Sequence, residues 1–213
     1  MATDLIVVRH GHSEGNLRDI FLGQGELPLT PLGREQAARV ADYLKNEPIA
    51  AIYSSDLSRA YQTAEPTAKI HGVPIVTRRE LREIDGGEWE WRLYADLAAE
   101  NSPAYRIWMK EKKNACPPGG ESVAHIYERI GAEMERIVKA HPGETVAVFT
   151  HATPALVFFL RAYGLWPDRI AELPWAQNAS VSRVRVENGT YSVLAYGETG
   201  FLEGIQTALP KTI

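Results

Sequence analysis

The side chains best suited to chemistry stand in one short N-terminal stretch, which holds Arg9, His10, His12, Ser13 and Asn16. This stretch combines a permanent cation, two imidazoles and neutral hydrogen-bonding groups. Such a set suits an anion, because guanidinium and imidazole groups form charge-assisted hydrogen bonds with anionic oxygens. We therefore expect a phosphate-binding loop here.

Another histidine, His151, follows an apolar run just as His10 does. Residues 5–8 and 145–150 are both apolar, and they lead into His10 and His151. Arg59 stands about one turn into the helix predicted after a third apolar run, near the positive end of that helix. Because parallel strands end at a common sheet edge, where open α/β sheets bind their ligands, we expect these three side chains and Arg9 to converge.

The expected chemistry follows from these charges. Arg9, Arg59 and a protonated or hydrogen-bonding His151 can stabilise the oxygens of a phosphomonoester without a metal. Their field disfavours protonation of His10, which keeps its imidazole neutral and nucleophilic. Attack by His10 would give a phosphohistidine, which water or a second hydroxyl then discharges. The leaving oxygen needs a proton, so a carboxylic acid must lie near the site.

The elements that must position these groups alternate between strand and helix. Residues 5–8 and 145–150 are typical of strands buried on both faces, and Ile49 to Tyr53 is a shorter strand of the same kind. Thr30-Pro31 predicts the start of a helix that runs to about Asn46. The polar cluster Ser54-Ser55-Asp56 predicts the N-cap of the helix that carries Arg59. We expect Pro66 to kink or end that helix near its second turn.

The remaining elements complete this alternation. Asn188-Gly189 is typical of a tight hairpin turn and lies between two runs that predict strands. The other predicted elements are a strand at 73–76, a helix at about 94–112, a long helix capped by Ser122, a helix from Thr153-Pro154 to Gly164, and the hairpin strands 181–186 and 191–196. The pattern favours an α/β three-layer sandwich, with a mostly parallel central sheet and helices on both faces.

One segment departs from this alternation. Residues at about 86–120 contain Gly86-Gly87 and three tryptophans but no predicted strand. We interpret the segment as an insertion over the sheet edge that could act as a lid or specificity loop. A structural insertion with buried tryptophans explains the same pattern. The whole chain, 1–213, is then one domain.

The composition of the chain limits its domain count, its partners and its cellular compartment. A chain of 213 residues suits one sizeable domain, and its net charge of -4 gives no sign of a nucleic-acid partner. A single cysteine, Cys116, excludes an internal disulfide and suggests a reducing cytoplasm. The N-terminus lacks signal-peptide features, and the longest apolar stretch, 145–166, is too polar to span a membrane. We expect a soluble cytoplasmic protein that has no membrane partner, and a homodimer stays an open possibility.

Several of these stretches together resemble one family. The tripeptide Arg9-His10-Gly11 resembles the nucleophile motif of the histidine phosphatase superfamily, which includes the cofactor-dependent phosphoglycerate mutases. Residues 54–60 with Thr63-Ala64 resemble its second motif, whose arginine binds phosphate. Residues 81–84, followed by 87–90, resemble the segment whose first glutamate is the general acid/base. The resemblance is to the phosphoglycerate mutase-like type, branch 1, and it implies that Glu83 is the proton donor.

The resemblance extends from about residue 5 to 155. It implies that His151 is the second core histidine and that Asn16 helps to hold phosphate. Ser13, Gln24 and Trp91 are candidate substrate-binding residues. Trp91 departs from the glycine that usually follows Trp-Glu in the family, so it is expected to reshape the substrate mouth. Residues 119–122 and the segment 28–37 are further matches. Two further departures are Ala152, which stands in place of a frequent glycine, and His12, to which we assign no catalytic role.

The implied function is that of a metal-independent phosphomonoesterase acting on a small phosphorylated metabolite, such as phosphoserine or a sugar-acid phosphate, with no cofactor. The alternative is a 2,3-bisphosphoglycerate-dependent phosphoglycerate mutase. A mutase needs extra cations over its site, but the basic residues between Trp91 and Pro117 form no paired arginine cluster: Arg92, Arg106, Lys110, Lys112 and Lys113. Two other hypotheses are weaker. A metal-dependent amidohydrolase built on His10 and His12 would need a barrel of about 250 residues. A non-catalytic phospho-ligand-binding module would not require both His10 and Glu83.

Overall fold

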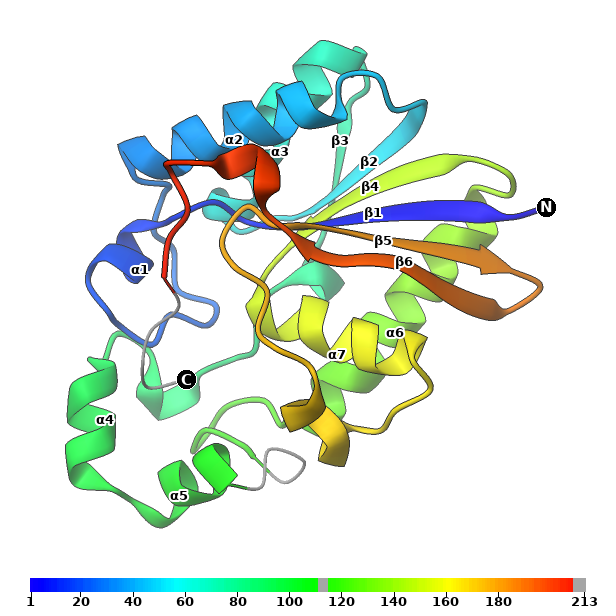
Figure 1. Ribbon diagram of the computed structural model, residues 1–213. Coiled ribbons are helices and arrows are strands. Elements are labelled where there is room, and N and C mark those ends of the chain that lie inside the picture. The colour runs from blue at the N-terminus through cyan, green and yellow to red at the C-terminus, as the bar shows by residue number, and fades with distance from the viewer. Residues whose placement is uncertain (111–114, 209–213) are drawn as a thin grey trace.

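The protein is built around one six-stranded sheet. The computed structural model describes residues 1–110 and 115–208. The sheet order is β3-β2-β4-β1-β5-β6 (Figure 1), and its strands are β1 (Thr3–Arg9), β2 (Ile49–Ser55), β3 (Ile75–Arg78), β4 (Thr145–Thr150), β5 (Val181–Glu187) and β6 (Thr190–Glu198). Strands β1 to β4 pair in parallel, whereas β5 and β6 form an antiparallel edge. The predicted, mostly parallel sheet is thus confirmed.

Helices cover both faces of the sheet (Figure 1). One face carries α2 (Pro31–Leu44) and α3 (Ser58–His71), and the other carries α6 (Val123–Ala140) and α7 (Ala152–Ala162). The short α1 (Glu14–Leu17) follows β1, while α4 (Tyr94–Glu100) and α5 (Pro103–Lys110) lie beyond the sheet edge. The expected three-layer architecture is confirmed, and no helix within 1–110 and 115–208 has the length and apolarity needed to cross a membrane.

The central strand β1 supplies both cores. Its side chains alternate, so that Leu5 and Val7 enter the core beneath α6 and α7, while Ile6 and Val8 enter the core beneath α2 and α3. All four are at most 1% exposed. Burial on both faces explains why this stretch is uniformly apolar rather than alternating, and it fixes the direction in which Arg9 and His10 leave the sheet.

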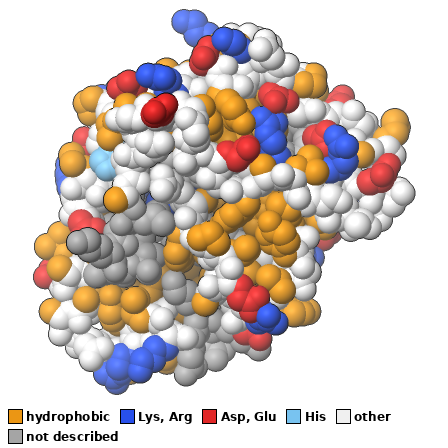
Figure 2. Space-filling view, viewed as in Figure 1, with side chains coloured by type: hydrophobic (Ala, Val, Ile, Leu, Met, Phe, Trp, Pro, Cys, Tyr) orange, Lys and Arg blue, Asp and Glu red, His pale blue; other side chains and the backbone are white. Residues whose placement is uncertain are grey.

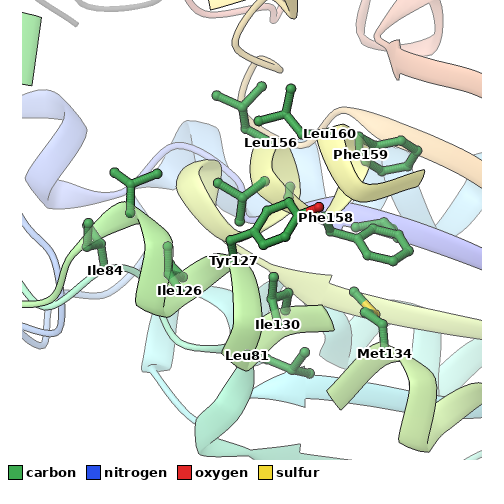
Figure 3. Packing of buried hydrophobic residues seen from close by; sticks show 14 of the residues in the cluster. Leu81, Ile84, Ile126, Tyr127, Ile130, Met134, Leu156, Phe158, Phe159 and Leu160 are labelled. Carbon is green, nitrogen blue, oxygen red and sulfur yellow. The ribbon is translucent and has the colours of Figure 1, made fainter. Parts of the chain in front are cut away.

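The core beneath α6 and α7 also contains the segment before the insertion. Figure 3 shows Leu81 and Ile84 beside Ile126 and Ile130 of α6, with Phe158 of α7 in the same cluster. Leu81 and Ile84 are almost fully buried. Burying two such side chains contributes roughly 3–6 kcal/mol, so the short connection between them is firmly anchored.

The helix starts agree only in part with the sequence prediction. Thr30 and Ser122 cap α2 and α6 through their side chains, as predicted. The N-cap expected at 54–56 is wrong, because β2 continues to Ser55 and the cap residue of α3 is Leu57. The carboxylate of Glu26, which is distant in sequence, accepts a hydrogen bond from the Ser58 backbone N–H instead.

Two predictions about helix continuity need correction. Pro66 does not end α3, which runs on to His71 with Ala64 and Thr67 both buried on its inner face. Their packing offsets the loss of one backbone hydrogen bond. The single helix predicted at 94–112 is two helices, because Asn101 adopts a left-handed conformation with φ 45° between α4 and α5. The end of that prediction, 111–112, lies outside the described residues.

Other boundaries shift by one or two residues. The strand predicted at 73–76 is β3, two residues later, and α7 begins at Ala152 rather than at Thr153. The predicted hairpin is confirmed between β5 and β6. Asn188 and Gly189 both have positive φ, 51° and 78°, as the two-residue turn requires.

Candidate active site

The candidate site lies where β1 and β4 end side by side. Arg9 is the register partner of Thr150, so His10 and His151 leave the sheet together, and their ring centroids are 5.1 Å apart. The cavity at this edge has a volume of about 60 Å³. Its lining combines polar and apolar groups: Arg9, His10, Ser13, Gly15, Asn16, Ile20, Phe21, Leu22, Arg59, Glu83, Ile84, Tyr94, Trp108, Ala152, Thr153 and Trp175.

His10 has the orientation and charge of a nucleophile. Its Nδ1–H donates to the Gly11 carbonyl oxygen at 2.7 Å, which leaves Nε2 as the nitrogen with a free lone pair. Burial, together with the positive charges of Arg59 and Arg9, lowers the pKa of His10 well below 6.5. The imidazole is therefore neutral at neutral pH, as the sequence predicts.

The glycine after His10 is required by a close backbone approach. A Cβ atom on Gly11 would lie 2.7 Å from the carbonyl oxygen of Gly33, at the start of α2. A Cβ on Gly33 would in turn collide with the carbonyl oxygen of His12. The two glycines let the loop after β1 pack directly on α2, and this contact holds His10 in place.

The two arginines of the cavity are held by backbone carbonyls. Arg9 donates to the Ala176 carbonyl at 2.6 Å, and its buried Nε has no partner among the described residues. Arg59 donates to the carbonyls of Gly23 and Gly25 at 2.7 and 2.9 Å. Burial lowers the pKa of Arg59 to about 10, which still leaves it charged at neutral pH. The cavity thus contains two fixed positive charges.

The loop that contacts Arg59 is closed by a carboxylate. Glu90 accepts hydrogen bonds from the backbone N–H groups of Gly23, Gln24, Gly25 and Gly86. The four bonds join the loop after α1 to the beginning of the insertion. Glu90 therefore has a structural task next to the cavity, which explains its place in the motif 87–90.

His151 lies beside His10 as a neutral group, but it is fully buried and is not among the residues that line the cavity. Its Nε2 lies 2.8 Å from the Ser55 hydroxyl, and its buried Nδ1 has no hydrogen bond to a described residue. Burial and the charge of Arg59 lower the pKa of His151 well below 6.5. Of the two options that the sequence leaves open for this residue, hydrogen bonding is thus favoured over a positive charge.

Glu83 brings a buried carboxyl group to the cavity. It is 8% exposed and accepts hydrogen bonds from the backbone N–H groups of Ile84 and Thr153, at 2.8 and 3.2 Å. Its neighbour Arg82 forms a two-pronged ion pair with Asp56 instead. Glu83 is therefore not a surface residue in an ion pair but a buried carboxyl group that lines the same cavity as His10 and the two arginines.

The structure does not bring all candidate residues to the cavity. Ser13 and Asn16 line it, but Gln24 and Trp91 do not. The Gln24 side chain bonds to the Glu83 carbonyl and to Arg82, outside the cavity. Trp91 is 53% exposed and has a φ of 69°. Its left-handed backbone, which suits the family's usual glycine, turns the ring toward Gly25 rather than inward.

Several lining residues were missed by the sequence analysis. Tyr94 and Trp108 enter from the insertion, and Thr153 and Trp175 come from the segments around α7. Burial raises the pKa of Tyr94, whose ring contacts Phe21. Thr153 was noted only as a helix start. No local pattern marks these residues, since they reach the cavity through long-range folding.

The family assignment follows from comparison with known proteins. The model of the histidine phosphatase superfamily (branch 1) matches residues 5–199, so the chain belongs to this superfamily. The resemblance first seen at Arg9-His10-Gly11 is thereby confirmed. The chain is a phosphatase or phosphoglycerate mutase-like enzyme, a class that acts on small phosphorylated substrates.

Individual relatives include both activities. The chain is 31% identical to phosphoserine phosphatase 1 of Hydrogenobacter thermophilus, over 98% of this chain and 99% of that protein. It is 33% identical to the probable phosphoglycerate mutase GpmB of Proteus mirabilis, over 87% and 86%. The structure of Bacillus stearothermophilus YhfR matches with a TM-score of 0.90 at 29% identity, over 94% of this chain and 100% of that one. Some curated relatives are longer, and the chain spans 42% of their length.

Proposed function

We propose that this protein is a metal-independent phosphomonoesterase that hydrolyses a small phosphorylated metabolite through a phosphohistidine on His10. One observation carries the proposal. The neutral Nε2 of His10 borders a cavity that also holds two buried arginines and the buried carboxyl group of Glu83. Nucleophile, phosphate-binding cations and proton donor are then present together.

The proposed reaction has two steps. In the first, His10 Nε2 bonds to phosphorus while the ester P–O bond breaks, and the leaving oxygen takes a proton from Glu83. In the second, a water oxygen bonds to phosphorus, its proton passes to Glu83, and His10 is released with inorganic phosphate. Arg9, Arg59, His151 and Asn16 hold the phosphoryl oxygens, whose charge must be stabilised in the transition state.

The dimensions and charge of the site support a small substrate. A cavity of about 60 Å³ suits a small ligand rather than a polymer. Lys and Arg side chains on the face in Figure 2 are interspersed with Asp and Glu, so that face has no broad basic area for a polyanion. Phosphoserine and sugar-acid phosphates are the metabolites that we propose to test first.

Hydrolysis is favoured over phosphoglycerate isomerisation. Among the described lining residues, only Arg9 and Arg59 are Lys or Arg side chains. Arg92 pairs with Glu100, and Arg106 donates to the Asn101 carbonyl, both away from the cavity. Lys112 and Lys113 lie outside the described residues. A mutase needs further cations to retain a bisphosphorylated intermediate.

We also propose that the described residues of the segment 86–120, which are 86–110 and 115–120, cover the site within a single domain. Tyr94 and Trp108, which come from this segment, line the cavity beside the catalytic groups. Their rings pack on Phe21, in the loop after α1. Water exclusion by such a cover would strengthen the electrostatic interactions that hold the phosphoryl group.

The direct test is phosphate release from a panel of phosphorylated metabolites after exhaustive treatment with EDTA. The panel should include phosphoserine, 3-phosphoglycerate and p-nitrophenyl phosphate. We expect turnover to survive chelation. Activity that returns only when Mg²⁺, Mn²⁺ or Zn²⁺ is added would contradict the proposal, and an absence of turnover on the whole panel would favour a binding module.

The fold also argues against the amidohydrolase alternative, because that class needs a closed barrel and the sheet of this protein is open.

A further inference from the structure

We propose that Asn178 is a positioning residue, which fixes the side-chain amide of Asn16 so that its NH₂ group faces the phosphoryl group of the substrate. Asn178 is 4% exposed and precedes β5, whereas Asn16 lies in α1 beside the cavity. The inference rests on the proposed function, and it adds a residue outside the cavity lining to the machinery that binds phosphate.

The backbone N–H of Ser13 shows which atom of the Asn16 amide is the oxygen. The Ser13 N–H donates to Asn16 Oδ1 at 3.0 Å, and the Ser13 hydroxyl does so at 2.9 Å. A backbone N–H can only donate, so the amide atom that faces it must be the oxygen. The Nδ2 of Asn16 therefore occupies the other position.

The amide atoms of Asn178 are assigned in the same way. Its Nδ2 lies 3.1 Å from the His10 carbonyl oxygen and 3.4 Å from that of Gly11. Carbonyl oxygens only accept, so the nitrogen must face them. The same Nδ2 donates to Asn16 Oδ1 at 3.2 Å, and Thr207 donates to the Oδ1 of Asn178 at 3.3 Å. Both ends of this side chain are thus held.

The consequence concerns the group that Asn16 offers to its ligand. Three donors occupy its Oδ1, while its Nδ2 has no hydrogen bond to any described residue. Because Asn16 lines the cavity, this nitrogen is available to a phosphoryl oxygen. Without Asn178, Asn16 Oδ1 would keep only its two hydrogen bonds from the neighbouring Ser13, so the amide would be held less firmly with its Nδ2 toward the phosphoryl group.

A double-mutant cycle with orthovanadate tests this coupling. Asn16→Ala and Asn178→Ala should each weaken vanadate inhibition and lower kcat/KM by about 10- to 100-fold, as expected for one hydrogen bond to a charged group. If Asn178 acts through Asn16, the double variant should be no more than about twofold worse than Asn16→Ala alone. Effects of the two substitutions that multiply would overturn the proposal, because they would show independent actions.

Two further measurements separate positioning from a loss of folding. Thr67→Val, which changes a buried hydroxyl without a hydrogen bond on α3, is the control and should leave vanadate inhibition unchanged. Asn178→Asp keeps the side-chain shape but loses the donor, so it should show the same coupling to Asn16. If neither Asn178 variant folds, as judged by thermal unfolding, the residue is structural and the proposal falls. If the wild-type protein neither turns over nor binds vanadate, the proposed function itself fails.

Discussion

His10 combines a free Nε2 with a lowered pKa, and both properties come from its immediate neighbours. We expect His10→Ala to lose essentially all turnover, because no other described side chain lining the cavity offers an equivalent nucleophile. Brief reaction of the wild-type protein with a labelled phosphodonor should leave a label that is labile in acid and stable in base, as phosphohistidine is. A label that persists on the His10→Ala protein would contradict the assignment.

The role proposed for Glu83, protonation of the leaving oxygen, matters more for some leaving groups than for others. An alkoxide departs poorly unless it is protonated, so Glu83→Gln should slow the first step on alkyl phosphates by about 10²–10⁴. A p-nitrophenolate is stable as an anion and should be affected far less. Single-turnover burst rates isolate this step from discharge of the phosphoenzyme.

The control for Glu83 is another carboxylate nearby. Glu88→Gln changes an exposed glutamate in the same segment and should leave both burst rates nearly unchanged. Equal loss on alkyl and aryl substrates, or no loss on either, would show that Glu83 is not the acid.

The two buried histidines should make the protein sensitive to acid. The pKa values of His10 and His151 lie well below 6.5 in the folded state, so the unfolded chain binds protons first as the pH falls. The contribution of these two neutral histidines to the free energy of unfolding is therefore fully present above pH 6.5 and decreases as the pH falls below that value. Each histidine contributes a slope of up to about 1.4 kcal/mol per pH unit, until the pH reaches its folded-state pKa.

This acid sensitivity can be assigned by substitution. Urea unfolding of the wild-type protein and of the His10→Gln/His151→Gln variant at pH 8, 6.5 and 5 would measure the free energy of unfolding. The variant should lose less stability than the wild type on acidification. Parallel pH profiles for the two proteins would contradict the prediction.

At the scale of elements, the segment that carries Glu83 is fastened by α6. Arg129 of α6 donates to the carbonyls of Glu80 and Arg82, at 2.6 and 3.1 Å. The carboxylate of Glu121 accepts two hydrogen bonds from Arg129, at 2.8 and 2.7 Å. With Leu81 and Ile84 anchored in the core (Figure 3), these bonds fix the backbone on both sides of Glu83.

Arg129→Met should therefore affect both stability and proton donation. It leaves the buried carboxylate of Glu121 without this partner, which should cost about 3 kcal/mol in the free energy of unfolding. We also expect a larger fall in burst rate for alkyl phosphates than for p-nitrophenyl phosphate, because Glu83 loses its support. Lys139→Met, which removes an exposed pair on the same helix, should change stability by less than about 1 kcal/mol. Equal loss of rate on the two substrates would leave Arg129 with a structural role only.

At the scale of the molecule, the identity of the phosphate acceptor decides between hydrolase and mutase. The described cavity lining contains two arginines and several apolar rings, so water should discharge the phosphoenzyme. With 3-phosphoglycerate and 2,3-bisphosphoglycerate present, phosphate release should be faster than isomerisation. Rapid interconversion of 2- and 3-phosphoglycerate with little phosphate released would instead identify a mutase. Phosphorus NMR follows both products in one sample.

The sequence by itself determined the features that depend on short-range patterns. Uniformly apolar runs predict β1 and β4, because strands buried on both faces need apolar side chains throughout. The position of His10 and His151 after these runs predicts their meeting at one edge, since parallel neighbours end together. Thr30, Ser122 and Asn188-Gly189 predict a local cap or turn correctly, because their conformational effect reaches only a few residues.

The tertiary structure decided everything that depends on contacts between distant segments. Asn178 meets Asn16 across 162 residues, and Glu26 rather than the cluster at 54–56 completes the start of α3. Tyr94 reaches the cavity only because the insertion folds back over the sheet edge. Periodicity carries no information about such contacts: they arise when the whole chain packs, and the burial that results is also what sets the charge of His10 and His151.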